Sequence, residues 1–301
     1  MEPLSLCGGD LPYERRVLRA DLAKPPRASL RRRRRRGRLV SLSCRHSPGP
    51  PGLSGSGRSR GTPRVVTGGA RAAVFRAGVQ VAGLCDAEEA EMVRAAGAVA
   101  LGFPLRLKDG REDLSEAAAT SVIQALSSRI ATVLITYQAE AEAIVDFAAT
   151  LGVSWVQFHG DVSPETVARV RALGPDLGLI KALVVQGAEA APVLEEARRF
   201  APWVDAFLTD TFDPATGRRG ATGQTHPWAV SRAVVDVGLA PVILAGGLSP
   251  ANVAEAIEAV RPWAVDAHSA LEGPDGRKDA ARVHAFIARA RATFQRFPPR
   301  A

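Results

Sequence analysis

The feature that most constrains the fold is an eightfold alternation of two kinds of segment, which begins at residue 78. Short apolar runs rich in β-branched residues, typical of parallel strands covered on both faces, alternate with alanine-rich amphipathic runs of helical period. The strand candidates are 78–83, 98–103, 131–136, 154–158, 178–184, 203–209, 241–245 and 262–267. Eight such pairs within about 220 residues predict an α/β fold, the (β/α)8 TIM barrel.

A doubly wound parallel sheet also alternates strands and helices, but it commonly carries a G-x-G-x-x-G loop after its first strand. No such loop follows residues 78–83. Two helical runs open with Ser-Pro, in SPETVARVRALG (163–174) and SPANVAEAIEAV (249–260). Serine is a favoured N-cap and proline suits the first helical position, so we expect helices to begin at Pro164 and Pro250.

Residues 1–75 differ in composition from the rest of the chain. They hold 17 Lys and Arg, including six consecutive arginines at 31–36, against 4 Asp and Glu; this segment has a net charge of +13 and the remainder −5, which together make the total of +8. Arginine, proline, glycine and serine without apolar periodicity predict a disordered extension, followed by a barrel over 76–297 that folds without it. A nucleic-acid-binding arm or an Arg-rich transit peptide stays open for the extension. The acidic barrel is not expected to bind nucleic acid.

The cysteines indicate neither a metal site nor a disulfide framework, because Cys7, Cys44 and Cys85 lack metal-ligand spacing and two of them lie in the basic extension. No apolar run reaches the roughly 18–20 residues of a membrane span. The first residues lack the basic-then-apolar order of a secretory signal. We therefore expect a cytoplasmic protein that uses neither a metal nor another cofactor. The sequence does not indicate an oligomeric state.

Residues that carry chemistry gather at the predicted strand ends, where barrel enzymes hold their sites. Asp210 follows an apolar strand and precedes a glycine-rich loop, where a carboxyl acts either as a general acid or as a brace for the loop. His159 and His268 also lie at strand ends, and a lone histidine there more often braces a loop than catalyses. Gly246 and Gly247 follow the seventh strand, and their backbone N–H groups suit a phosphate dianion.

Taken in order, these strand ends resemble the phosphoribosylanthranilate isomerase family over about residues 78 to 295. VQFHGD (156–161) is similar to the family's V-Q-L-H-G-D, and VDAFLTDT (204–211) to V-D-A-x-L-L-D-T. GATG (220–223) stands where the family has G-G-T-G, and LAGGLSPANV (244–253) is close to L-A-G-G-L-x-P-x-N-V. VDAHSALEGPDGRKD (265–279) parallels V-D-V-S-S-G-V-E-x-x-P-G-x-K-D. The ordered set is far more specific than one motif.

The resemblance implies an Amadori rearrangement in tryptophan biosynthesis, in which the aminoaldose N-(5-phosphoribosyl)anthranilate opens and becomes the aminoketose. In the family, a general acid protonates the furanose ring oxygen and a general base removes the proton from C2 of the ribose. The resemblance makes Asp210 the acid and places the anthranilate carboxylate on Arg111, whose guanidinium suits a carboxylate by its bidentate geometry. Asp266 matches a family aspartate near the substrate. The phosphate is expected against backbone N–H groups around Gly246, Gly247, Ser269 and Ala270.

The general base is missing from its expected position. The family's first strand ends in K-I-C-G, whose cysteine is the base, and this chain has QVAG (80–83), with Gln80 for the lysine and Ala82 for the cysteine. The candidate substitutes are Cys85, three residues past Ala82, and His268, in HSA where the family has S-S-G. Three interpretations stay open: a slow or rewired isomerase, a relative that acts on another sugar phosphate, and a non-catalytic barrel that binds a phosphoribosyl ligand.

Overall fold

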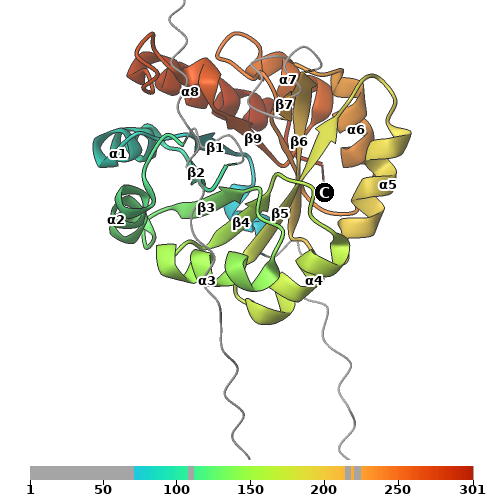
Figure 1. The fold of residues 1–301 in the computed structure, drawn as a ribbon. Helices are drawn as coiled ribbons and strands as arrows, with labels where there is room; N and C mark the ends of the chain where they lie inside the picture. Colours follow the sequence, from blue (N-terminus) through green and yellow to red (C-terminus); the bar gives the residue numbers. More distant parts are fainter. Residues whose placement is uncertain (1–70, 108–111, 214–217, 220–224, 301) are drawn as a thin grey trace, which may run out of the picture. The chain divides into compact units, whose positions relative to one another are not determined.

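The computed structural model describes residues 71–107, 112–213, 218–219 and 225–300, and these fold as the predicted (β/α)8 barrel (Figure 1). The parallel strands of the barrel are β1 (Gly78–Ala82), β2 (Ala100–Pro104), β3 (Ala131–Thr136), β4 (Trp155–Phe158), β5 (Gly178–Val185), β6 (Ala206–Asp213), β8 (Val242–Leu244) and β9 (Ala264–Ala267). Their order is β5-β4-β3-β2-β1-β9-β8-β6, and pairing of β5 with β6 closes the barrel. The short β7 (Arg218–Arg219) pairs antiparallel with the end of β6.

The eight predicted strands are confirmed, with bounds that differ by a few residues. The difference at β6 affects the candidate site, because this strand runs to Asp213 instead of ending at residue 209. Its parallel pairing with β5 matches Val184 with Asp210 and Val185 with Thr211. The strand then continues into its antiparallel pairing with β7. Asp210 therefore lies inside a strand, and the ladder holds its backbone more firmly than a loop would.

Helices follow the strands and cover the outside of the barrel (Figure 1). They are α1 (Ala87–Ala96), α2 (Glu116–Leu126), α3 (Ala141–Leu151), α4 (Pro164–Leu173), α5 (Ala191–Phe200), α6 (Trp228–Val237), α7 (Val253–Val260) and α8 (Ala280–Arg296). The predicted start of α4 is confirmed, since Ser163 Oγ accepts a hydrogen bond from the Thr166 N–H at 3.1 Å and Pro164 is the first helical residue. No helix among the described residues is long and apolar enough to cross a membrane.

The expected start of α7 at Pro250 is wrong, because the helix begins at Val253. The Asn252 side chain explains the delay. Its Oδ1 accepts from the Ser249 N–H at 2.8 Å, and its Nδ2 donates to the Gly247 carbonyl at 3.0 Å. These bonds close a turn ahead of the helix, so Asn252 takes the N-cap position expected for Ser249.

Two apolar layers stabilise the barrel. Side chains of alternate strand residues form an inner core inside the barrel, which includes Ala82, Trp155 and Leu208. Residues of the opposite parity, such as Val81 and Phe207, pack outward against the helices. Because successive strand residues point to opposite faces, this parity shows where polar side chains point: even-numbered residues of β1, β6 and β9 and odd-numbered residues of β4 face the barrel interior.

The barrel includes residues that precede the predicted boundary at residue 76. Ala72–Phe75 form a short 3-10 helix, η1, in which Ala72 and Phe75 are buried. The Phe75 ring packs edge-on against Trp155 of the inner core, with ring centroids 4.9 Å apart. Trp263 Nε1 donates to the Ala72 carbonyl at 2.9 Å. Residues 71–75 thus belong to the barrel, while the extension predicted before them lies outside the described residues.

Candidate active site

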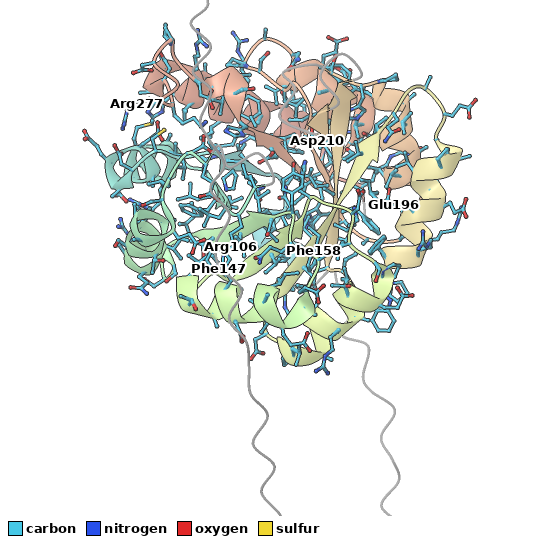
Figure 2. The ribbon with its side chains drawn as sticks, in the orientation of Figure 1. Arg106, Phe147, Phe158, Glu196, Asp210 and Arg277 are labelled. Carbon is cyan, nitrogen blue, oxygen red and sulfur yellow. The ribbon has the colours of Figure 1, made fainter. Side chains whose placement is uncertain are left out.

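A group of polar side chains faces the barrel interior at the carboxyl ends of its strands. This inner polar cluster consists of Gln80 on β1, Gln157 and His159 at the end of β4, Asp210 on β6 and Asp266 on β9, all of them buried. Their parity matches that of the inner core on each strand. The alternation of strand residues therefore brings together side chains that lie as much as 186 residues apart in the sequence. Figure 2 shows Asp210 near the end of β6, where this strand runs toward β7.

Hydrogen bonds link this cluster from β1 to β6. Gln80 Nε2 donates to Gln157 Oε1 at 3.0 Å, and Gln157 Nε2 lies 3.5 Å from His159 Nδ1. His159 Nε2 is 3.4 Å from Asp210 Oδ2. The other Asp210 oxygen, Oδ1, accepts from the Thr211 N–H at 2.7 Å. The sequence singled out His159 only as a loop brace, and the structure places its ring against the predicted general acid.

Asp266 has the most perturbed carboxyl of the cluster. Burial raises its pKa to about 7, and the negative charge of Asp210 adds to the rise, while a hydrogen bond from Gln80 and the charge of Lys278 act in the opposite direction. Within the described residues, its Oδ1 is buried and has no hydrogen-bond partner. A carboxyl whose pKa lies close to neutral pH is able both to give and to accept a proton.

A second polar network lies between β6 and α6, on the two residues that flank Asp210 in the chain. His226 Nδ1 lies 3.0 Å from Thr211 Oγ1, and His226 Nε2 lies 2.6 Å from Ser231 Oγ. Ser231 Oγ in turn donates to Thr209 Oγ1 at 2.8 Å. Burial lowers the pKa of His226 to about 4, against a smaller raising effect of the Asp210 charge, so the ring is neutral at physiological pH. This network joins α6 to the segment of β6 that carries Asp210.

Sequence reasoning missed His226 and its network. The signal that the sequence offered was a lone histidine after the glycine-rich loop, in GATGQTHPW (220–228). No local pattern distinguishes it from a surface histidine. Its burial depends on the packing of α6 against β6, which the sequence does not display.

Gly246 and Gly247 form the turn after β8, with φ of 86° and 64°. Both values lie in the left-handed region that favours glycine. A Cβ on Gly246 would lie 2.2 Å from Thr211 Oγ1, so the turn packs directly against the network beneath Asp210. After β9, Ser269–Leu271 form a short 3-10 helix, η2, which contains the predicted phosphate contacts Ser269 and Ala270. Arg111, predicted to bind the anthranilate carboxylate, lies outside the described residues.

The two candidate substitute bases lie beyond the end of β1. The His268 ring covers Gly83, where a Cβ would lie 1.8 Å from His268 Nε2. This nitrogen is 3.3 Å from Glu272 Oε1 and 3.7 Å from Asp113 Oδ2. Cys85 Sγ is 4.0 Å from the Gly276 carbonyl oxygen.

The surroundings of Cys85 disfavour a reactive thiolate. Burial raises the pKa of this thiol, and the negative charges of Glu89 and Asp113 add to the rise, whereas the charges of Lys278 and Arg277 oppose it. The thiolate is the form that removes protons, so this environment leaves less of Cys85 in the proton-accepting form at neutral pH. Ala82 itself belongs to the inner core, where its methyl group faces Gly102 on β2.

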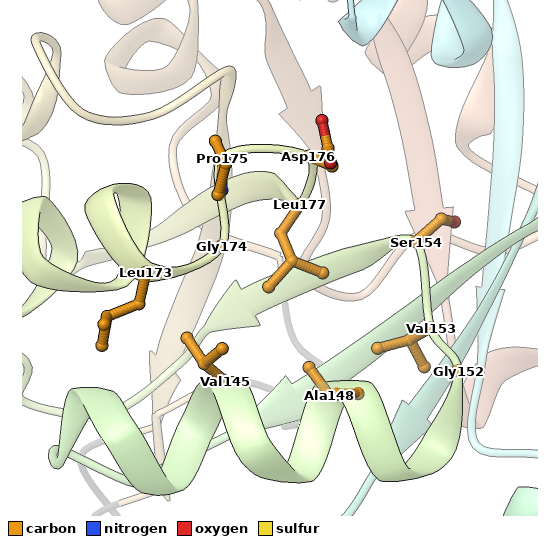
Figure 3. Close-up of a pocket in the computed structure, with 11 residues that line it drawn as sticks. Val145, Ala148, Gly152, Val153, Ser154, Leu173, Gly174, Pro175, Asp176 and Leu177 are labelled. Atoms are coloured by element: carbon orange, nitrogen blue, oxygen red, sulfur yellow. The ribbon is translucent and has the colours of Figure 1, made fainter.

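A distinct pocket lies at the opposite end of the barrel, between the last turns of α3 and α4 and the start of β4 (Figure 3). Val145 and Ala148 of α3 face Leu177 across it. Asp176 is the one charged residue among those that line the pocket. This pocket therefore lacks the paired acid and base groups that the strand ends at the other side of the barrel supply.

A sequence profile of the family described as "N-(5'phosphoribosyl)anthranilate (PRA) isomerase" matches residues 80–289. The chain is 41% identical over 220 residues to the N-(5'-phosphoribosyl)anthranilate isomerase of Halobacterium salinarum. This alignment covers 71% of this chain and 96% of that protein. The chain is also 36% identical over 217 residues to N-(5'-phosphoribosyl)anthranilate isomerase 2 of Methanosarcina mazei. This second alignment covers 72% of this chain and 95% of that protein.

Solved structures give the same result. N-(5'-phosphoribosyl)anthranilate isomerase from Pyrococcus furiosus superimposes with a TM-score of 0.60 at 27% identity, over 71% of this chain and 98% of that one. A phosphoribosyl anthranilate isomerase solved in complex with reduced 1-(o-carboxyphenylamino)-1-deoxyribulose 5-phosphate has a TM-score of 0.58 at 28% identity, with the same coverage.

Proposed function

The chain belongs to the N-(5'-phosphoribosyl)anthranilate isomerase family, and we propose that it converts N-(5'-phosphoribosyl)anthranilate to 1-(2-carboxyphenylamino)-1-deoxyribulose 5-phosphate in tryptophan biosynthesis. The observation that carries this proposal is the position of Asp210. The family match extends through this residue, and the structure buries its carboxyl inside the barrel at the carboxyl end of β6. Active sites of TIM-barrel enzymes lie at this end.

Asp210 acts as the general acid in this proposal. It gives a proton to the furanose ring oxygen while the bond from C1 to that oxygen breaks and the anthranilate nitrogen forms a C1=N⁺ iminium. A base then removes the proton from C2, which yields an enol amine. Uptake of a proton at C1 and loss of one from the C2 hydroxyl complete the aminoketose, so no proton is gained or lost overall. A positioned acid of this kind contributes about 10²–10⁴-fold to the rate.

The substrate is held at both ends. Backbone N–H groups of Gly246 and Gly247 in the turn after β8, and of Ser269 and Ala270 at the first positions of η2, are proposed to bind the phosphate, since first-turn N–H groups lack intrahelical acceptors. Arg111 is proposed to bind the anthranilate carboxylate. The related isomerase in complex with a reduced phosphorylated product analogue supports a phosphorylated ligand here. The cytoplasmic location and independence of metals and cofactors remain predictions from the sequence.

Turnover of the purified protein tests the proposal against its two alternatives. Incubation with N-(5'-phosphoribosyl)anthranilate should yield the aminoketose, identified by its chromatographic retention against an authentic standard. Expression of the chain should also restore growth of a tryptophan auxotroph that lacks this isomerase. Binding of the reduced product analogue without turnover would contradict the proposal and favour a non-catalytic barrel. If the protein neither binds the analogue nor turns over the substrate, another sugar phosphate would be favoured as its substrate.

A further inference from the structure

We propose that the Asp266 carboxylate is the general base of this chain and removes the C2 proton that the cysteine removes elsewhere in the family. This inference rests on the proposed isomerase function and adds the one group that the site lacks at Ala82. Asp210 remains the acid. The two carboxyls of the inner polar cluster thereby supply the first two proton transfers of the reaction, to the ring oxygen and from C2.

The position of β9 places Asp266 on the correct side of the barrel. β9 pairs directly with β1, and the register sets Asp266 beside Gln80, two residues before Ala82 on the same face of β1. Asp210 reaches the interior from β6, which is separated from β9 by β8. A substrate that presents its ring oxygen to Asp210 and its C2 toward the end of β1 therefore has Asp266 beside C2.

Asp266 also has a free acceptor that the fold does not use. Its Oδ1 and the neighbouring Gln80 Oε1 are both buried without a hydrogen-bond partner among the described residues. Buried acceptors of this kind are rare, because each costs about 1–3 kcal/mol when it is left unsatisfied. A proton on Asp266 converts one of its oxygens into a donor, so the apo site already suits a carboxyl that takes up a proton.

The replacement of the family's lysine by Gln80 fits the same role. A cation at position 80 would stabilise an ionised Asp266 and weaken it as a base. Gln80 is neutral and buried. The pKa of Asp266 is raised to about 7 by burial first and by the charge of Asp210 second, while a hydrogen bond from Gln80 and the charge of Lys278 act in the opposite direction. Catalysis by a general base is most efficient when its pKa lies near the working pH. Gln80 and Ala82 therefore form a compensating pair of changes.

The reaction needs one proton in this pair of carboxyls. Interacting carboxyls hold one proton between their two titration steps. Burial and the charge of Asp210 favour that proton on Asp266 in the empty site, so the bound substrate has to draw it to Asp210 and leave Asp266 ionised. Asp210 gives its proton to the ring oxygen, and Asp266 takes the C2 proton as the electron pair of that bond forms the C1=C2 double bond. The pair still holds one proton afterwards, which returns to Asp210 before the next turnover.

The rival candidates are less well placed. The Cys85 thiol lies near the Gly276 carbonyl, among carboxylates that disfavour its ionisation. The His268 ring lies over Gly83 with Nε2 directed to Glu272 and Asp113, outside the inner core. Asp266 is the candidate that shares the interior face with Asp210.

The test compares Asp266→Asn with Asp113→Asn, a control at a more exposed carboxyl whose pKa is also raised, first by desolvation, but which lies beside His268 instead of inside the barrel. Asp266→Asn should lower kcat by about 10²–10⁴-fold, and it should bind the reduced product analogue within about threefold of wild type. Asp113→Asn should keep kcat within about threefold. Circular dichroism melting confirms that each variant folds.

A pH profile gives a second measurement that does not depend on the folding of Asp266→Asn. The kcat/KM of wild type should rise with pH through a midpoint near the pKa of Asp266, about 7, because the base must be ionised. Gln80→Lys should shift this rising limb to lower pH, whereas the ionisation of the substrate phosphate is the same for both proteins and cancels in the comparison.

Activity that survives Asp266→Asn, or a rising limb that Gln80→Lys leaves in place, would overturn the assignment. Loss of activity in His268→Ala together with an active Asp266→Asn would make His268 the base. Both outcomes leave the isomerase function intact. A wild-type protein that binds the analogue but turns nothing over would instead refute the proposed function, so the two failures are distinguishable.

Discussion

Substitution of Gly246 by alanine probes whether the turn after β8 supports the site beneath Asp210. Gly246 has a φ of 86°, and an alanine in the left-handed region is strained by about 1–2 kcal/mol. The new methyl group would lie 2.2 Å from Thr211 Oγ1 and 3.1 Å from both the Thr211 backbone nitrogen and His226 Nδ1. The hydroxyl has to move, because no such contact is tolerated.

The displacement has a calculable consequence. Rotation of the Thr211 side chain relieves the contact but removes its 3.0 Å hydrogen bond to His226 Nδ1, and a buried polar group left without a partner costs about 1–3 kcal/mol. Together with the backbone strain, Gly246→Ala should lower the free energy of unfolding by about 2–5 kcal/mol. A smaller conformational entropy of the unfolded alanine chain offsets roughly 0.4–1 kcal/mol of this.

Gly238→Ala is the matched control. Gly238 has a φ of 67° at the end of α6, but a Cβ there meets nothing within 4 Å. Only the backbone strain remains, so this variant should lose about 1 kcal/mol. Urea denaturation followed by circular dichroism measures both values, with equal m-values showing that the unfolded states match. Equal losses in the two variants would refute the argument that Gly246 packs against the network. Gly246→Ala should also weaken binding of the reduced product analogue, which Gly238→Ala should leave unchanged.

Three further predictions follow from the described contacts. Asp210→Asn should lower kcat by at least about 10²-fold while the reduced product analogue still binds, because the amide keeps the shape of the carboxyl but gives no acidic proton; a variant with more than a tenth of wild-type kcat would contradict the role of Asp210. The pKa of His226 is about 4 in the folded chain and about 6.5 in the unfolded chain. As the pH falls, the unfolded state therefore takes up the proton first. The contribution of His226 to stability should fall by roughly 2 kcal/mol between about pH 7.5 and about pH 5. Urea titrations at both pH values should show this loss in wild type relative to His226→Phe. The comparison with the variant is needed because the raised pKa of Asp266 changes the stability of both proteins in the opposite direction. A stability difference between wild type and His226→Phe that does not depend on pH would count against a buried neutral ring. A chain that starts at residue 76 should melt about 5–10 °C below one that starts at residue 71. The shorter chain lacks Phe75, whose burial against Trp155 is worth on the order of 3 kcal/mol. Equal melting temperatures would show that η1 does not stabilise the barrel.

The sequence determined the barrel and indicated the approximate place of the candidate site. Apolar period is a local property, and runs such as 131–136 and 178–184 are readable without knowledge of their neighbours. The fold followed from this alternation together with the lack of a G-x-G-x-x-G loop after residues 78–83. The departure at Ala82 was also visible in the sequence, because it is a change of residue type within one motif.

Tertiary structure decided which groups interact and with what strength. The pKa of Asp266 depends on burial and on the charge of Asp210, which reaches it from a strand 56 residues earlier in the chain. Burial of His226 depends on how α6 packs against β6, and the attachment of residues 71–75 to the barrel depends on the contact of Phe75 with Trp155. These are contacts between segments distant in sequence, and local pattern carries no information about them, because desolvation and Coulomb interactions depend on distances that exist only once the barrel has closed.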